Sequence, residues 1–137
     1  GVQTCALPIS NDIPCVTGWS RFDNRWKGVA TKDLVHIVNV VEGATHCILY
    51  CADGYTTNVR IDRFSADYVI LAHSWNGAPL TDVHGGPLRI VLPQWYFWKS
   101  AKWIRRIEFV SADSPGFWET RGYHDDGDPW NEERYQE

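Results

Sequence analysis

The chain has 137 residues and a formal net charge of -4. That length allows one domain with a buried core. The moderate, mixed charge argues against nucleic acid or an anionic membrane surface as the main partner, and no apolar run is long enough to span a membrane.

The N-terminal residues 1–9 read GVQTCALPI, which matches the translation of a common short-read sequencing adapter, and the chain contains no Met. We therefore expect residues 1–10 to be an adapter artefact and residues 11–137 to be the C-terminal part of a domain, so Cys5 carries no functional argument. Three cysteines remain of the four in the chain. An odd number does not suggest a disulfide framework, so we expect a cytoplasmic location, although an export signal would lie in the missing part.

Residues 11–28 are rich in Gly, Pro, Asn and Asp. This composition predicts a loop, with one short extended piece at Cys15–Trp19. Apolar residues recur at helical spacing over Thr31–Val41 and predict an amphipathic helix, with Thr31 as its N-cap and Gly43 at its C-terminal end.

Short β-prone runs separated by turn residues follow the helix and predict a series of strands. Asp53-Gly54 and Asn76-Gly77 are the turn signals, and residues 111–137 are interpreted as an ordered tail packed by its own aromatic residues. The fold class expected is α+β, mixed and mostly β. The predicted strands are His46–Tyr50, Tyr55–Ile61, Tyr68–His73, Leu88–Leu92 and Trp103–Val110.

Cys15 follows a proline and precedes a glycine by three residues, which predicts a thiol on a loop. A thiolate suits a thiophilic metal such as copper, zinc or molybdenum, and it also suits nucleophilic catalysis. A buried structural cysteine is an equally weighted interpretation from the residues alone.

Cys47 and Cys51 lie four residues apart in a predicted strand, so both side chains share one face. With His46 beside them a zinc site is conceivable, but a second ligand pair at knuckle spacing is missing. Two small core side chains are the favoured interpretation.

The segment from His84 to Arg89 contains two glycines that let the backbone pass close to a bulky group. The imidazole of His84 and the guanidinium of Arg89 together suit a phosphate or another anion. Ser100, Ala101 and Lys102 follow in a short basic loop whose hydroxyl, ammonium and N–H groups suit phosphate oxygens. A tight turn with solvated basic residues explains both segments about as well.

Taken together, these segments resemble the molybdopterin-binding domain of the sulfite oxidase family, and in particular its small, single-domain bacterial members. The resemblance covers nearly the whole chain after the adapter. The matching segments are Cys15–Ser20, Trp26–Val29, Asp53–Thr57, His84–Arg89, Trp98–Trp103, Gly116–Glu119, Gly122–His124, Gly127–Trp130 and Glu133–Tyr135.

The resemblance implies a sulfite-oxidase-type fold, here partial, and a molybdenum–molybdopterin cofactor with one pterin per metal ion. In this family one cysteine thiolate binds molybdenum, and Cys15 matches it. Tyr55 is implied as the active-site tyrosine. The implied cofactor-binding residues are Cys51, His84, Arg89, Ser100, Ala101 and Lys102.

The activity implied is two-electron oxygen-atom transfer on a small oxyanion or sulfoxide, with the cofactor carrying the chemistry. The electron acceptor stays open. The family domain begins well before the cysteine, so the truncation puts cofactor binding and activity of this chain in question. The alternative function is a non-catalytic anion- or zinc-binding module that uses His46, Cys47, Cys51 and His84.

Overall fold

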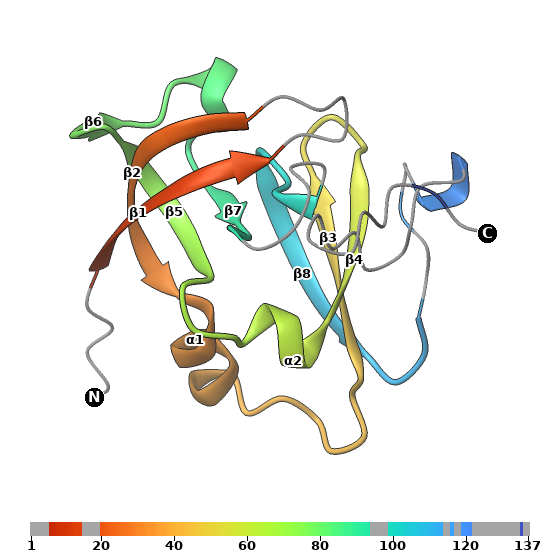
Figure 1. The fold of residues 1–137 in the computed structure, drawn as a ribbon. Helices are drawn as coiled ribbons and strands as arrows, with labels where there is room; N and C mark the ends of the chain where they lie inside the picture. The colour runs from red at the N-terminus through yellow and green to blue at the C-terminus, as the bar shows by residue number, and fades with distance from the viewer. Residues whose placement is uncertain are drawn as a thin grey trace.

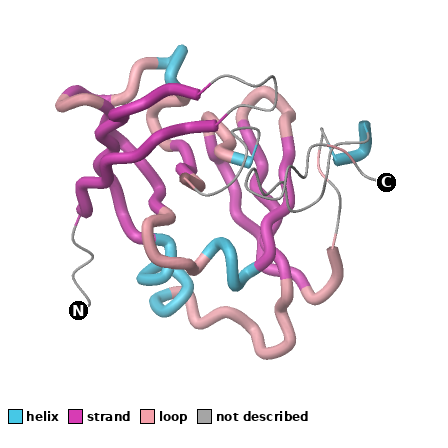
Figure 2. Tube along the Cα trace, in the orientation of Figure 1, coloured by secondary structure: helices cyan, strands magenta, loops and turns pink. Residues whose placement is uncertain are grey.

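Two antiparallel sheets form the body of the molecule in the computed structural model, which describes residues 6–14, 20–93, 99–113, 116, 119–121 and 135. Figures 1 and 2 show the sheets side by side, with the two short helices at the same end of both. Within the described residues, the helices are too short or too polar to cross a membrane.

The first sheet has the strand order β1-β2-β5-β6, and β7 also pairs with β5. The second sheet has the order β4-β3-β8. This mostly β architecture confirms the expected fold class. The first sheet comprises β1 (Ala6–Pro14), β2 (Ser20–Ala30), β5 (Ile70–Trp75), β6 (Ala78–Pro79) and β7 (Arg89–Val91). The second comprises β3 (His46–Cys51), β4 (Thr56–Arg60) and β8 (Ile104–Val110).

The loop predicted over residues 11–28 is wrong for the residues described, because the end of β1 and most of β2 occupy them. The extended piece predicted at Cys15–Trp19 lies outside the described residues. β2 pairs with β1 on one side and with β5 on the other. These partners include residues nearly fifty positions away, such as Trp75 opposite Trp26. Pairing at that range satisfies the backbone hydrogen bonds of a segment whose local composition favours turns.

The predicted helix is confirmed in place but is shorter, since α1 spans Thr31–Ile37. Its N-cap is Ala30, not Thr31. The Thr31 hydroxyl instead donates to the carbonyl oxygens of Phe64 and Val69 and is fully buried. A second helix, α2 (Ile61–Phe64), takes the last residue of a predicted strand.

The predicted strands after residue 45 are all confirmed, with ends that shift by one or two residues. The Asn76-Gly77 turn is also confirmed, because both residues have positive φ angles, +49° and +84°. Only part of the predicted tail is described, and it includes the 3-10 helix η3 (Glu119–Arg121).

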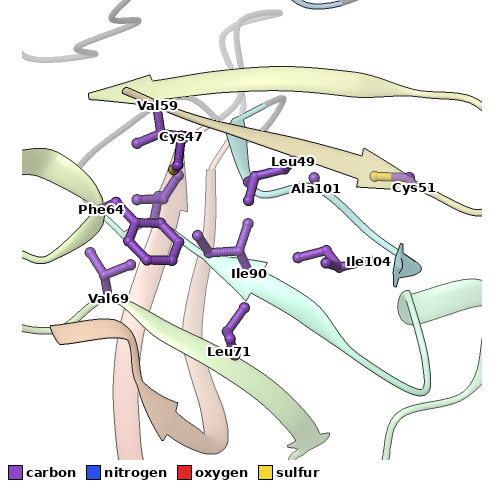
Figure 3. Close-up of a cluster of buried hydrophobic side chains, with 11 residues drawn as sticks. Cys47, Leu49, Cys51, Val59, Phe64, Val69, Leu71, Ile90, Ala101 and Ile104 are labelled. Atoms are coloured by element: carbon purple, nitrogen blue, oxygen red, sulfur yellow. The ribbon is translucent and has the colours of Figure 1, made fainter. Parts of the chain in front are cut away.

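The core lies between the two sheets and joins them (Figure 3). Cys47 and Cys51 sit there on the same face of β3, and each is a free, buried thiol. Burial raises the pKa of Cys47 to about 12 and that of Cys51 to about 11. The structural interpretation of this pair is thus the one that fits. The cluster contains Cys47, Leu49, Cys51, Val59, Phe64, Val69, Leu71, Ile90, Leu92, Ala101 and Ile104.

Candidate functional site

The turn from His84 into β7 lies directly against the basic loop that follows residue 98. Gly85 has a φ of +102°, and a Cβ atom there would lie 2.8 Å from Cγ of Lys102 and 3.2 Å from Cβ of Arg89. The carbonyl oxygen of Gly85 accepts from the N–H of Trp103 at 3.1 Å. Glycine is therefore required on two grounds, its backbone conformation and the close approach of the two cationic side chains.

Arg89 is the largest fully buried side chain among the described residues, at 1% exposure. Its guanidinium donates to the carbonyl oxygens of His84 and Ser100, each at 2.9 Å. Burial lowers the pKa of Arg89 to about 10, so it remains a cation at neutral pH. One arginine thus ties the turn before β7 to the loop after it.

Backbone contacts bring the loop of Ser100, Ala101 and Lys102 alongside β7. The carbonyl oxygen of Ala101 accepts from the N–H of Ile90 at 3.0 Å, and the N–H of Leu92 donates to the Ser100 hydroxyl at 3.0 Å. The Ser100 hydroxyl accepts in this bond, and a hydroxyl group can also donate its own proton. Ser100 and Ala101 are buried, and Lys102 is half-buried.

Lys102 lies beside Arg89, so two positive charges share this corner of the fold. Its Nζ donates to the carbonyl oxygen of Val83 at 2.8 Å and lies 5.5 Å from the ring centroid of Trp103. Burial, followed by repulsion from Arg89, lowers the pKa of Lys102. Repulsion between neighbouring cations is relieved when an anion binds between them.

Cys51 and Tyr55 flank the β3–β4 turn, on the neighbouring sheet. The turn touches the basic loop, because the N–H of Ala52 donates to the carbonyl oxygen of Trp103 at 2.9 Å. Tyr55 packs against the core cluster that contains Cys51 and Ala101. Burial, then the charge of Glu119, raises the pKa of Tyr55, so its phenol stays protonated.

A buried ion pair connects these parts, and the sequence analysis did not identify it. Lys99 Nζ lies 2.6 Å from Glu119 Oε1, with side chains 2% and 0% exposed. Lys99 also donates to the backbone and side-chain oxygens of Asn58, and Thr57 donates to Glu119. Both charged residues lie in motifs that the sequence analysis quoted, but their sequence spacing gave no sign of a pairing.

Two tryptophans on adjacent strands complete the surroundings of His84 and Arg89. The His84 ring lies 4.3 Å from the Trp75 ring, and the Arg89 guanidinium lies 4.9 Å from the Trp26 ring. Trp26 belongs to one of the sequence motifs, but no sequence pattern predicted a role for either tryptophan.

The structure thus brings together His84, Arg89, Ser100, Ala101 and Lys102, with the turn of Cys51 and Tyr55 at one side. Cys15, the predicted molybdenum ligand, lies outside the described residues. Among the residues that the structure describes, no three His, Cys, Asp or Glu side chains gather as a metal site. The zinc module built on His46, Cys47, Cys51 and His84 therefore has no support there.

The fold is similar to that of a protein of known structure. The crystal structure of the sulfane dehydrogenase SoxCD from Paracoccus pantotrophus superimposes with a TM-score of 0.70 at 20% identity, covering 78% of this chain and 32% of that one. At this identity the likeness shows the fold alone.

Residues 9–118 match the model of the oxidoreductase molybdopterin binding domain. The chain belongs to this family, which confirms the resemblance found in its motifs and implies a molybdenum cofactor. It is 53% identical over 125 residues to the oxidoreductase YuiH of Bacillus subtilis (strain 168), covering 91% of this chain and 63% of YuiH. It is 28% identical over 116 residues to a sulfite oxidase of Arabidopsis thaliana, covering 72% of this chain and 29% of that protein.

It is also 29% identical over 121 residues to the protein-methionine-sulfoxide reductase catalytic subunit MsrP of Ralstonia nicotianae, covering 77% of this chain and 36% of MsrP. The chain therefore spans less than two thirds of the length of each of these relatives.

Proposed function

We propose that the protein is a molybdenum–pterin oxidoreductase that catalyses two-electron oxygen-atom transfer on a small oxyanion or sulfoxide. The observation that carries the proposal is the convergence of Arg89, Lys102, His84 and Ser100 from two separate segments onto one corner of a fold whose family binds molybdopterin. The cofactor is taken to be one pterin per molybdenum, and it supplies the two-electron chemistry.

The residues present fit the phosphate of such a cofactor. Arg89 and Lys102 bring two cations into a partly desolvated part of the fold, where burial disfavours both charges and Arg89 also disfavours the charge of Lys102. A dianionic phosphate reverses that balance, and the Ser100 hydroxyl is a group that can donate to one of its oxygens. Arg89 acts mainly by charge and by fixing the loop, because its guanidinium is buried against two carbonyl oxygens.

Cys15 is proposed as the metal ligand, with its sulfur deprotonated by the metal. Tyr55 is proposed as a hydrogen-bond donor to the substrate, and the raised pKa of its buried phenol keeps that proton in place. Cys51, as a neutral thiol in contact with the same core, is proposed to border the cofactor.

The positive charges of Arg89 and Lys102 favour a small anion or a polar oxide as the substrate. The MsrP and sulfite oxidase relatives act, by their names, on a protein sulfoxide and on sulfite, so both classes remain within the proposal. A redox partner must accept or supply the electrons. We propose a cytoplasmic location, from the odd number of cysteines.

The test is to produce the chain in a host that synthesises molybdopterin and to measure molybdenum and released pterin per folded protein. We expect both in equal amounts, with Cys15→Ser losing the metal. Cys47→Ala is the matched control, because it removes a thiol whose burial keeps it from any ligand. Folded protein with stoichiometric zinc and no pterin would contradict the proposal.

A further inference from the structure

Four residues around the candidate site form a closed ring of contacts. The rings of His84 and Trp75 lie 4.3 Å apart, those of Trp75 and Trp26 lie 6.1 Å apart, and the Arg89 guanidinium lies 4.9 Å from the Trp26 ring. Arg89 closes the circle by donating to the His84 carbonyl oxygen at 2.9 Å. His84 and Arg89, two of the candidate cofactor-binding residues, are therefore each in contact with a tryptophan ring.

The strands that carry the tryptophans are fixed independently of the site. Trp26 and Trp75 are directly opposed in the β2–β5 pairing. Next to them, Arg25 and Asn76 exchange two hydrogen bonds, Asn76 N to Arg25 O at 2.7 Å and Arg25 N to Asn76 Oδ1 at 3.1 Å. Trp26 is buried at 3% exposure. The two indoles thus sit on a sheet, which positions groups more accurately than a loop.

Of the two residues that they contact, Arg89 opens β7, whereas His84 belongs to a turn. His84 ends η1 (Asp82–His84), a single 3-10 turn that follows β6 after two residues. A histidine on such a turn has free rotation about its side-chain bonds unless another group restricts it. The tilted contact with Trp75, at an interplanar angle of 46°, supplies that restriction.

We infer that Trp75 and Trp26 are positioning residues, which hold His84 and Arg89 in the arrangement that binds the cofactor. The inference rests on the proposed function, because it takes these two residues as cofactor-binding groups. Neither indole is required to touch the cofactor. Their contribution is preorganisation, since side chains already fixed lose less conformational freedom when the ligand binds.

The experiment uses Trp75→Leu, with Trp75→Phe as the conservative variant. Trp75 is half-buried, so its replacement is less disruptive than that of Trp26. The matched control is Tyr50→Leu, in the second sheet. Tyr50 is another half-buried ring in contact with an arginine, because the Arg106 guanidinium lies 5.0 Å from its centroid. Thermal unfolding of every variant reports any general loss of stability.

The first readout is made without cofactor, by NMR relaxation of the His84 imidazole. We expect a rigid ring in the wild type and in Trp75→Phe and Tyr50→Leu, and a mobile ring in Trp75→Leu. The second readout is the rate at which the loaded protein releases pterin, followed by fluorescence. We expect Trp75→Leu to release it about threefold to tenfold faster, as for one immobilised side chain, with Trp75→Phe near the wild type.

A rigid His84 in Trp75→Leu would overturn the inference, as would a mobile His84 with an unchanged rate of release. An equal acceleration by Tyr50→Leu would also overturn it, since the effect would then be one of general stability. Wild-type protein without pterin would contradict the proposed function instead, and the NMR measurement would still show whether Trp75 orders His84.

Discussion

At the scale of single residues, the Lys99–Glu119 pair places two charges in the core with almost no exposure to water. The loss of either partner leaves the other charge buried, and such losses cost about 3–5 kcal/mol. Asn58 accepts a hydrogen bond from Lys99, and Thr57 donates one to Glu119. The pair joins the loop of the candidate phosphate site to β4 and η3.

We expect Lys99→Met to reduce the free energy of unfolding by about 3–5 kcal/mol, measured by urea denaturation. Lys32→Met is the control, because Lys32 and Asp67 form an exposed pair whose side chains are 51% and 73% accessible. That variant should unfold at the wild-type urea concentration. The double variant Lys99→Met, Glu119→Leu should recover part of the lost free energy of unfolding, because it also removes the unpaired carboxylate. If nothing is recovered, an unpaired buried charge is not the cause of the loss.

The buried thiols predict a loss of stability at alkaline pH. Burial raises the pKa of Cys47 from 9.0 to about 12. The folded pKa is above the unfolded one, so the unfolded chain loses its proton first and stability falls as the pH rises from about 9 towards 12. The slope from Cys47 is about 1.4 kcal/mol per pH unit. Urea denaturation between pH 8 and 11 should give a smaller decline for Cys47→Ala than for the wild type, and equal declines would contradict this assignment.

At the scale of elements, the sequence predicted most strands because their signals are local. The β-prone run of β5 and the Asn76-Gly77 turn after it are recognised without reference to any distant residue. β1 and β2 were missed for the opposite reason. Their turn-forming composition is overridden by pairing with each other and with β5, which no local pattern records.

The contact between β2 and β5 depends on Gly28. A Cβ atom there would lie 2.0 Å from the carbonyl oxygen of Leu71 and 2.6 Å from Cα of Ala72, and both are backbone atoms that cannot turn aside. We expect Gly28→Ala to destabilise the protein by about 1–3 kcal/mol or more, as overpacking does, measured by thermal unfolding. Lys27→Ala, at the exposed neighbouring position, should leave the midpoint unchanged, so a loss common to both variants would refute the steric explanation.

The candidate site was predicted from sequence residue by residue, but not as an arrangement. The glycines before Arg89 and the basic loop with Lys102 indicated anion binding, and the structure does place them together. The positioning contacts of Trp75 and the ion pair of Lys99 could not be predicted, because each joins segments that are far apart in the chain.

At the scale of the whole molecule, a cofactor between the two segments of the site would bind only the folded state. Any such ligand raises stability, by about 2.7 kcal/mol when present at one hundred times its dissociation constant. We therefore expect the pterin-loaded protein to melt at a higher temperature than the same protein stripped of cofactor, by differential scanning calorimetry. Arg89→Met should reduce the difference in melting temperature between the loaded and the stripped protein. If that difference stays unchanged, Arg89 does not belong to the cofactor site.

The sequence alone determined the family, the mostly β fold and the identity of the candidate cofactor-binding residues, because these depend on motifs and on local hydrophobic patterns. Only the tertiary structure decided that β1 and β2 are strands, that Arg89 is buried against two carbonyl oxygens, and that Trp26 and Trp75 enclose His84 and Arg89. The physical reason is the same in each case. Hydrogen bonds and ring contacts between distant segments form only when the chain has folded, and they then prevail over the preference of each segment taken by itself.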